Sequence, residues 1–154
     1  MGFEFRKQDS VEICGRRYAL DISSPEFIGA VTEDFTAILS KYNVFQQLQN
    51  DCMKPGMTKE DMEAATKQLI EENQNIAELG RDFIIRALGK DAYEQIFAGR
   101  APSSVDHIEL CAYIYREAMR QRQALVKNYV NKNRRERRAA ARAAKKSGGF
   151  REGL

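Results

Sequence analysis

The sequence predicts a mainly α-helical protein in which an N-terminal β-hairpin packs on a bundle of about four helices, followed by a long basic C-terminal helix or tail. Three observations predict this class. Apolar residues alternate along residues 11–22, recur at steps of three and four through most of the following chain, and give way to a basic, alanine-rich composition after residue 130. We therefore expect a helical domain with its hairpin over residues 1–130 and a basic extension over residues 131–154.

The hairpin is predicted to turn at Gly15, because glycine takes a positive φ at no steric cost. Apolar and polar residues alternate on both sides of this glycine, as in strands with one buried face. An isolated hairpin is only marginally stable in water, so this one is expected to pack against the helices. The alternating apolar residues are Val11, Ile13, Tyr18, Leu20 and Ile22.

The first helix is predicted to begin at Ser24 and Pro25. A hydroxyl cap, a proline in the first turn and a carboxylate, Glu26, near the positive end of the helix dipole form a typical start signal. The proline and glycine within residues 54–56 are expected to end this helix. Its apolar stripe consists of Phe27, Val31, Phe35, Ile38, Tyr42 and Phe45.

The second helix is predicted to start from a capping box formed by Thr58 and Asp61, and to end at Gly89. Residues 71–75 are polar on all sides, so the helix is expected to be either exposed or broken there. Gly80, like Gly89, is interpreted as helix punctuation. The apolar positions are Met62, Leu69, Ile76, Leu79, Phe83, Ile84 and Leu88.

Two further helices are predicted after the second. A short one covers residues 91–98 and stops at Gly99, and the last one opens at residues 101–104 with Asp106 in its first turn. High alanine, arginine and lysine content near the C-terminus favours helix without anything to bury, so this end is expected to be a solvated helical extension or a segment that folds on a partner. The buried side of the last helix is predicted to consist of Ile108, Cys111, Ile114, Tyr115, Ala118, Leu125 and Tyr129.

Charge is divided unevenly along the chain. Residues 116–154 contain 13 Lys and Arg against 3 Asp and Glu, a net charge of +10, whereas residues 1–115 contain 12 against 19, a net charge of −7. An acidic body with a basic end is typical of an interaction protein. The basic residues expected to make contacts are Arg134, Arg135, Arg137, Arg138, Arg142, Lys145 and Lys146.

Two interpretations of this basic end are open. Its arginines would neutralise phosphates, and an arginine-rich helix can fold into an RNA groove. Alternatively, the end keeps the protein soluble and docks on acidic helices of a partner protein. The absence of interleaved aromatic residues weakens the case for single-stranded nucleic acid, so we favour protein docking over nucleic-acid contact.

The sequence does not indicate an enzyme, and no catalytic, cofactor-binding or metal-binding residue is predicted. His107 is the only histidine, and its position at the start of a helix predicts an exposed surface residue. Neighbouring carboxylates such as Glu60 and Asp61 point in different directions on a helix, so they do not converge for acid–base chemistry. Neither of the common glycine-rich phosphate-binding loops occurs in the sequence.

Composition also bounds where the protein works. No apolar run approaches the ~20 residues needed to cross a bilayer, so no membrane association is expected. The first residues lack the basic and apolar regions of a secretory signal. Cys14, Cys52 and Cys111 lie far apart and are odd in number, which favours free thiols in a reducing compartment over disulfides or a zinc site. The predicted location is the cytoplasm.

The apolar helix faces have two interpretations. They are most simply core, packed beneath the hairpin, but a protein with this many amphipathic helices could also leave a groove for a partner helix. The residues assigned to partner binding on this basis are Phe27, Val31, Phe35, Phe83, Ile96 and Phe97.

Four phrases of the sequence resemble the small tail assembly chaperones of long-tailed, siphovirus-type phages and prophages. The hairpin ends in residues 20–22, the first helix opens with residues 24–27, and the last helix carries residues 106–110. Between them, residues 83–97 contain a Leu-Gly-x-x-Ala-x-x-x-Ile-Phe phrase, which in this family precedes a short loop and a helix. The resemblance covers residues 1–130 and leaves the basic end unmatched.

The resemblance implies a non-enzymatic protein that coats the long helical tape measure protein before tail tube subunits polymerise. A long, partly apolar helix aggregates when left bare, and many weak helix contacts that tube subunits displace one at a time suit this task. Two alternatives stay open: a small nucleic-acid-binding protein that uses its arginine-rich end, and a structural tail or head-completion subunit. The sequence also leaves open whether the chain forms a homo-oligomer.

Overall fold

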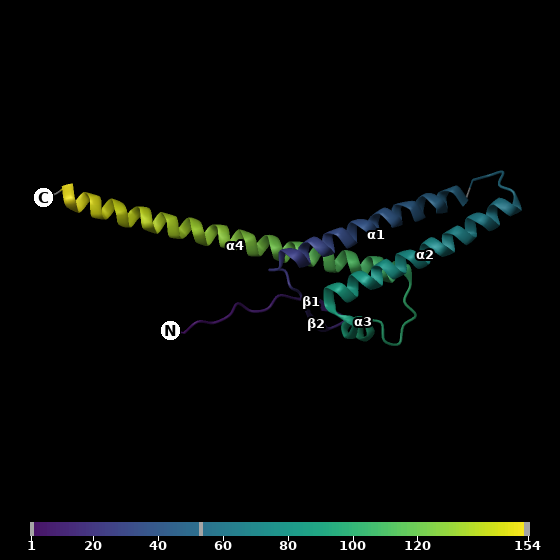
Figure 1. Ribbon diagram of the computed structural model, residues 1–154, viewed down its shortest axis with the longest axis horizontal. Coiled ribbons are helices and arrows are strands. Elements are labelled where there is room, and N and C mark those ends of the chain that lie inside the picture. The colour runs from purple at the N-terminus through teal and green to yellow at the C-terminus, as the bar shows by residue number, and fades with distance from the viewer. Residues whose placement is uncertain (1, 53, 153–154) are drawn as a thin grey trace. The chain divides into compact units, whose positions relative to one another are not determined.

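The computed structural model describes the backbone of residues 2–52 and 54–152, and the side chains of these residues up to residue 145. Helices make up 75% of the chain and follow an N-terminal two-stranded antiparallel hairpin (Figure 1). The predicted fold class is therefore confirmed. The elements are β1 (Ser10–Ile13), β2 (Arg16–Ala19), α1 (Pro25–Cys52), α2 (Lys59–Leu88), α3 (Lys90–Ile96) and α4 (Ser104–Glu152).

The chain divides into two units, residues 1–119 and residues 120–154. The helix α4 contributes to both, because it runs without interruption from Ser104 to Glu152. The basic end of the chain is therefore helical over its described residues. The division precedes the change in composition at residue 130, and the independent folding of residues 1–130 stays a prediction.

The hairpin turns at Cys14 and Gly15, whose φ angles of 52° and 79° both lie in the left-handed region. Two consecutive residues of this kind form the tight turn whose twist matches that of paired strands. Val11 pairs with Tyr18 across the ladder. The predicted turn at Gly15 is thus confirmed, and Cys14 shares its unusual backbone conformation.

The hairpin packs on the helices of the first unit, as predicted. The side chains of Val11 and Ile13, on one face of β1, are buried. The hydroxyl group of Tyr113 in α4 donates a hydrogen bond to the backbone carbonyl oxygen of Glu12 at 2.9 Å. This bond ties β1 directly to α4, so the hairpin gains from tertiary contacts the stability that two strands alone lack.

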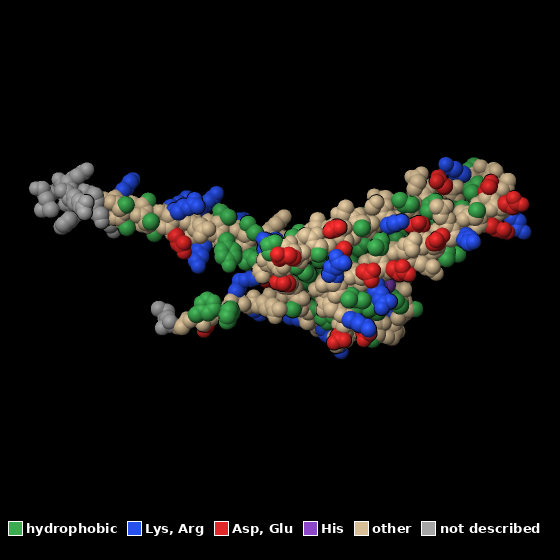
Figure 2. Space-filling view, viewed as in Figure 1, with side chains coloured by type: hydrophobic (Ala, Val, Ile, Leu, Met, Phe, Trp, Pro, Cys, Tyr) green, Lys and Arg blue, Asp and Glu red, His purple; other side chains and the backbone are tan. Residues whose placement is uncertain are grey.

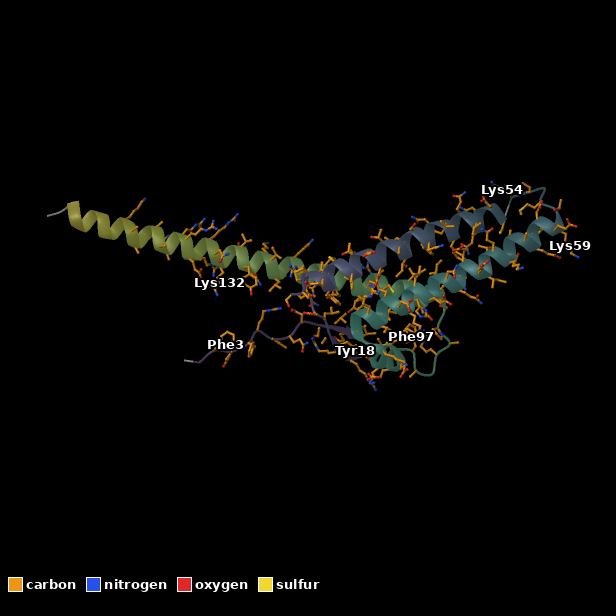
Figure 3. The ribbon with its side chains drawn as sticks, in the orientation of Figure 1. Phe3, Tyr18, Lys54, Lys59, Phe97 and Lys132 are labelled. Atoms are coloured by element: carbon orange, nitrogen blue, oxygen red, sulfur yellow. The ribbon has the colours of Figure 1, made fainter. Side chains whose placement is uncertain are left out.

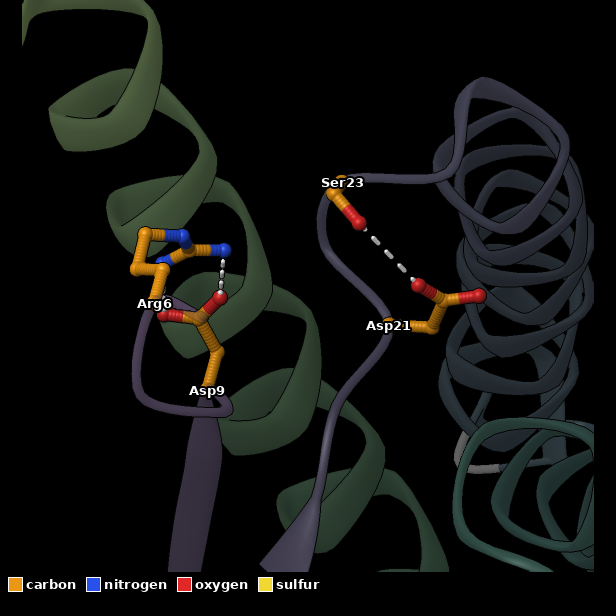
Figure 4. A network of polar contacts seen from close by, with 4 residues as sticks. All are labelled: Arg6, Asp9, Asp21 and Ser23. Atoms are coloured by element: carbon orange, nitrogen blue, oxygen red, sulfur yellow. Dashed lines mark hydrogen bonds and ion pairs between the residues drawn. The ribbon is translucent and has the colours of Figure 1, made fainter. Parts of the chain in front are cut away.

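Short-range polar contacts shape the chain on either side of the hairpin (Figure 4). Before β1, the guanidinium Nη2 atom of Arg6 lies 2.5 Å from Asp9 Oδ2. After β2, the Ser23 hydroxyl donates to Asp21 Oδ1 at 3.3 Å. These contacts fix the segments through which the chain enters β1 and passes into α1.

The predicted helix caps form. The backbone N–H of Phe27 donates to Ser24 Oγ at 3.2 Å at the start of α1, and a serine in this place satisfies a donor that the helix leaves unpaired. Thr58 Oγ1 accepts from the backbone N–H of Asp61 at 3.1 Å at the start of α2. Gly89, with a φ angle of 100°, ends that helix. The polar residues 71–75 stay helical, so the alternative of a break in α2 is wrong.

The helices α1 and α2 run antiparallel and pack against each other (Figure 1). Their fully buried residues lie in the first part of α1, up to Ile38, and in the last part of α2, from Ile76 onward. In the remaining parts, residues 39–52 and 59–75, none of the described side chains is fully buried. The core of the first unit thus covers only about half of each helix, on the order of 20 Å at 1.5 Å per residue.

Candidate partner-binding surface

The residues that the sequence assigns to partner binding lie mostly inside the fold. Val31 and Phe83 are 0% exposed. Phe35 is half-buried, and its ring stacks on that of Tyr115 in α4 at a centroid distance of 4.5 Å. Phe27 is also half-buried. Because Val31 and Phe83 present no surface, they support the helix packing rather than offer a contact, and we place the candidate surface elsewhere.

The other two assigned residues, Ile96 and Phe97, are half-buried at the end of α3. The Phe97 ring stacks on the imidazole of His107 at 4.8 Å and 18°. His107 is only 2% exposed, so the prediction of a surface histidine is wrong. The reason is tertiary: α3 places the rings of Tyr93 and Phe97 over the first turn of α4, which a helix-start pattern does not reveal.

Two hydrogen bonds hold the imidazole ring of His107 in place. Its Nδ1 atom donates to the backbone carbonyl oxygen of Ser103 at 2.7 Å, because a carbonyl oxygen only accepts. With the proton on Nδ1, the Nε2 atom is the acceptor and receives the hydrogen bond of the Tyr93 hydroxyl at 2.8 Å. Both ring nitrogens are satisfied, which is what a buried imidazole requires. The lone histidine is a packing residue that joins α3 to α4.

Gly80 lies inside α2 and not at its end, so its interpretation as helix punctuation is wrong. A Cβ atom at this position would lie 2.7 Å from the Cβ atom of His107. The missing side chain is what allows α2 and α4 to approach closely. Cys111 of α4 donates through its thiol to the Gly80 carbonyl oxygen at 3.4 Å. Small residues thus set the distance between these helices.

The pKa values of two groups, the buried thiol of Cys111 and the half-buried carboxyl group of Asp34, are shifted from their usual values. Burial, together with the negative charge of Asp34, raises the pKa of the Cys111 thiol to about 12. Burial also raises the pKa of Asp34, which the guanidinium of Arg86 at 3.2 Å opposes. A thiol this hard to ionise is a poor nucleophile at neutral pH. Among the described residues, no three His, Cys, Asp or Glu side chains are grouped to hold a metal ion.

A fixed register joins α2 to α4. The Ser104 hydroxyl at the start of α4 donates to the side-chain oxygen of Asn73, and Cys111 contacts Gly80. Each pair is separated by 31 residues, so the two helices run parallel over this stretch. Asn73 and Gly80 define the face of α2 that α4 covers, and this cover begins at Ser104.

The same face of α2 continues uncovered toward its N-terminus. Going back from Asn73 in steps of three and four reaches Ile70, Thr66 and Met62, which share one side of the helix. Ile70 is 57% exposed and Met62 is 52% exposed. We call Met62, Thr66 and Ile70 the open α2 face. Sequence periodicity places Met62 on an apolar stripe but does not reveal that nothing covers it.

The apolar side of α4 also continues uncovered. Its buried residues recur at steps of three and four: Ser104, His107, Cys111, Ile114 and Ala118. The same steps lead on to Leu125, which is half-buried, and to Tyr129, which is 60% exposed. The prediction that Tyr129 is buried is therefore wrong. Val126 and Val130, which flank these positions, are 47% and 43% exposed. We call Leu125, Val126, Tyr129 and Val130 the α4 stripe.

The basic residues predicted to make contacts lie on exposed helix. The side chains from Arg134 to Lys145 are all exposed. Lys and Arg side chains gather along this part of α4 (Figure 2), which follows the Lys132 labelled in Figure 3. The side chain of Lys146 lies outside the described residues. At 100° per residue, most of the Lys and Arg of residues 120–145 fall on the side of the helix opposite the α4 stripe. These residues are Arg120, Lys127, Arg134, Arg135, Arg138, Arg142 and Lys145.

The chain was compared with protein families, curated proteins and solved structures. No protein-family model, curated protein or solved structure matches this chain. Within the described residues, none of the helices combines the length and the apolar character that crossing a membrane requires.

Proposed function

We propose that this chain is a non-enzymatic interaction protein that holds a partner α-helix, and that it acts as a tail assembly chaperone of a siphovirus-type phage or prophage. In this role it binds the tape measure protein in the host cytoplasm and keeps it soluble until tail tube subunits replace it. The resemblance of residues 1–130 to that family supports the proposal, and so does the arrangement of the helix faces.

The observation that carries the proposal is the open α2 face. It is the direct continuation of a face that already packs a helix, since α4 covers α2 from Asn73 onward. A partner helix that lies on α2 N-terminal to Asn73, where α4 no longer covers it, would meet the same kind of surface, with Met62 and Ile70 as apolar anchors. Met62 and Ile70 give this face two exposed apolar side chains one turn either side of Thr66, a small apolar contact for a helix. A contact with only two apolar anchors binds weakly, which suits a chaperone that tail tube subunits must displace.

Co-expression with the tape measure protein of the same phage tests this proposal. We expect the tape measure protein to be insoluble alone and soluble with this chain, and we expect Met62→Ser combined with Ile70→Ser to abolish most of the rescue. Val44→Ser is the matched control, because Val44 is also about half exposed but points away from the α4-facing side of α1. A tape measure protein whose solubility is indifferent to this chain would refute the proposal.

The exposed basic side of residues 120–145 favours a second candidate function, binding of nucleic acid. Several arginines in a row on one helix face can each neutralise a phosphate. Binding through six or more phosphates would weaken by about 10³-fold or more between roughly 50 and 200 mM salt, whereas apolar helix binding would change little. A salt titration with a duplex RNA and with a tape measure fragment distinguishes the two candidates.

A further inference from the structure

Two helix faces of this chain end uncovered, and each continues a face that is covered elsewhere in the same fold. The open α2 face continues the side of α2 on which α4 packs, and the α4 stripe continues the side of α4 that packs on α2. We propose that the α4 stripe of one copy docks on the open α2 face of a second copy, so that the free protein associates head to tail.

The packing inside one chain provides the pattern for this contact. Gly80 and Cys111 show that α2 accepts the apolar side of α4 at close range and in parallel. Both uncovered faces repeat at steps of three and four, so their ridges and grooves follow the same spacing as the covered ones. The open α2 face spans residues 62–70 and the α4 stripe spans residues 125–130, about 12 Å and about 8 Å at 1.5 Å per residue, so the stripe fits within the face.

Charge favours docking of the α4 stripe on the open α2 face over contact between the α4 stripes of two copies. Residues 120–145 contain ten Lys and Arg against one Glu, a net charge of +9, so two such segments repel each other side by side. Residues 1–119 contain 13 Lys and Arg against 20 Asp and Glu, a net charge of −7. The basic segment of one copy is therefore attracted to the first unit of another.

The continuity of α4 favours a second copy as the occupant. The first part of α4 covers α2 of its own chain, and the stripe follows along the same helix, which is continuous from Ser104 to Glu152. Each copy carries one stripe and one open face, and these are different surfaces. Contacts of this heterologous kind do not close after two copies, so the expected products are chains that lengthen with concentration.

Sedimentation velocity of the nuclease-treated full chain at low salt tests the proposal. We expect oligomers that grow with concentration and shrink as salt is raised. The stripe variant combines Val126→Ser with Tyr129→Ser, and the face variant combines Met62→Ser with Ile70→Ser. All four side chains are about half exposed, so both variants are expected to keep the helical circular dichroism of the parent. Each is expected to weaken association at least tenfold, because exposed aromatic and aliphatic anchors dominate such contacts.

Mixing the two variants separates this pairing from every symmetric alternative. The stripe variant keeps an intact open α2 face and the face variant keeps an intact α4 stripe, so the mixture is expected to form one-to-one dimers that do not grow further. Val44→Ser, on another side of α1, should leave association unchanged. A monomeric full chain, a face variant that associates like the parent, or a mixture that stays monomeric would each overturn the proposal. Association that disappears on nuclease treatment would overturn it as well.

This inference does not depend on the proposed function, because the experiment contains this chain alone. Failure of the tape measure rescue with intact self-association would refute the chaperone role and leave the head-to-tail contact standing.

Discussion

Replacing Gly80 by alanine tests the account of how α2 and α4 pack. In an ordinary helix this change stabilises by about 0.5–1 kcal/mol, because alanine loses less conformational entropy than glycine. Here the new Cβ atom would lie 2.7 Å from His107 Cβ and 3.3 Å from His107 Cγ. His107 cannot turn aside without losing its bonds to Ser103 and Tyr93.

The net effect follows from these opposing terms. Forcing an extra carbon into a packed contact costs about 1–3 kcal/mol, and each hydrogen bond that is strained adds about 1 kcal/mol. We therefore expect Gly80→Ala to lower the free energy of unfolding by about 1–3 kcal/mol after the helix gain is subtracted. Urea denaturation followed by circular dichroism at the helix band measures this difference directly.

Gly29 provides the matched control. It lies within α1, and a Cβ atom built on it would meet nothing within 4 Å. Gly29→Ala should therefore stabilise the protein by up to about 1 kcal/mol through the same change in entropy. If both alanine variants unfold at the same or higher urea concentration than the parent, the close contact between α2 and α4 is not as described.

Four further predictions concern the same region and the proposed contacts. Tyr93→Phe should destabilise the protein by about 1–3 kcal/mol, since His107 Nε2 would stay buried without its donor; urea denaturation against the parent checks this. Cys14 and Cys52 should react with a thiol reagent in the folded protein, whereas Cys111 should react only after unfolding, as a count of labelled thiols will show. Burial raises the folded-state pKa of Cys111 from 9.0 to about 12, so the stability that the protonated thiol contributes is complete below about pH 9. Between about pH 9 and 12 the free energy of unfolding should fall by about 1.4 kcal/mol per pH unit. Cys111→Ala should make this fall with pH less steep in denaturation curves, and an unchanged dependence on pH would contradict the prediction. A tape measure fragment added to the associated protein should convert it to smaller complexes in sedimentation, because the fragment and the α4 stripe of a second copy compete for the open α2 face.

Local signals predicted the local structure well. The turn at Gly15, the cap at Thr58 and the helix end at Gly89 each depend on a few neighbouring residues, and all three form as predicted. The mainly helical class follows from periodicity for the same reason. These features need no knowledge of what packs on them.

The sequence failed where burial depends on distant elements. His107 is buried because the segment at α3 covers it. Position 80, in the middle of α2, is a glycine because α4 approaches α2 closely there. A period of three and four residues is the same whether a helix face is covered or open, so it could not separate the buried Ala118 from the exposed Tyr129. The candidate surface was missed for that reason. Its residues have an ordinary core pattern, and Ile70 stays exposed because the covering helix α4 begins only at Ser104, opposite Asn73.

The parallel register of α2 and α4 has a kinetic consequence. Contact between α2 and α4 requires closure of the segments that separate Asn73 from Ser104 and Gly80 from Cys111, 31 residues in each case. Because α4 is the last helix of the chain, α2 is made before the helix that covers it. Until then the whole side of α2 from Met62 to Ile84 faces solvent on a newly made chain. During that interval the α4 of a neighbouring molecule competes with the chain's own helix, and crowding of nascent chains therefore favours exchange of α4 between copies.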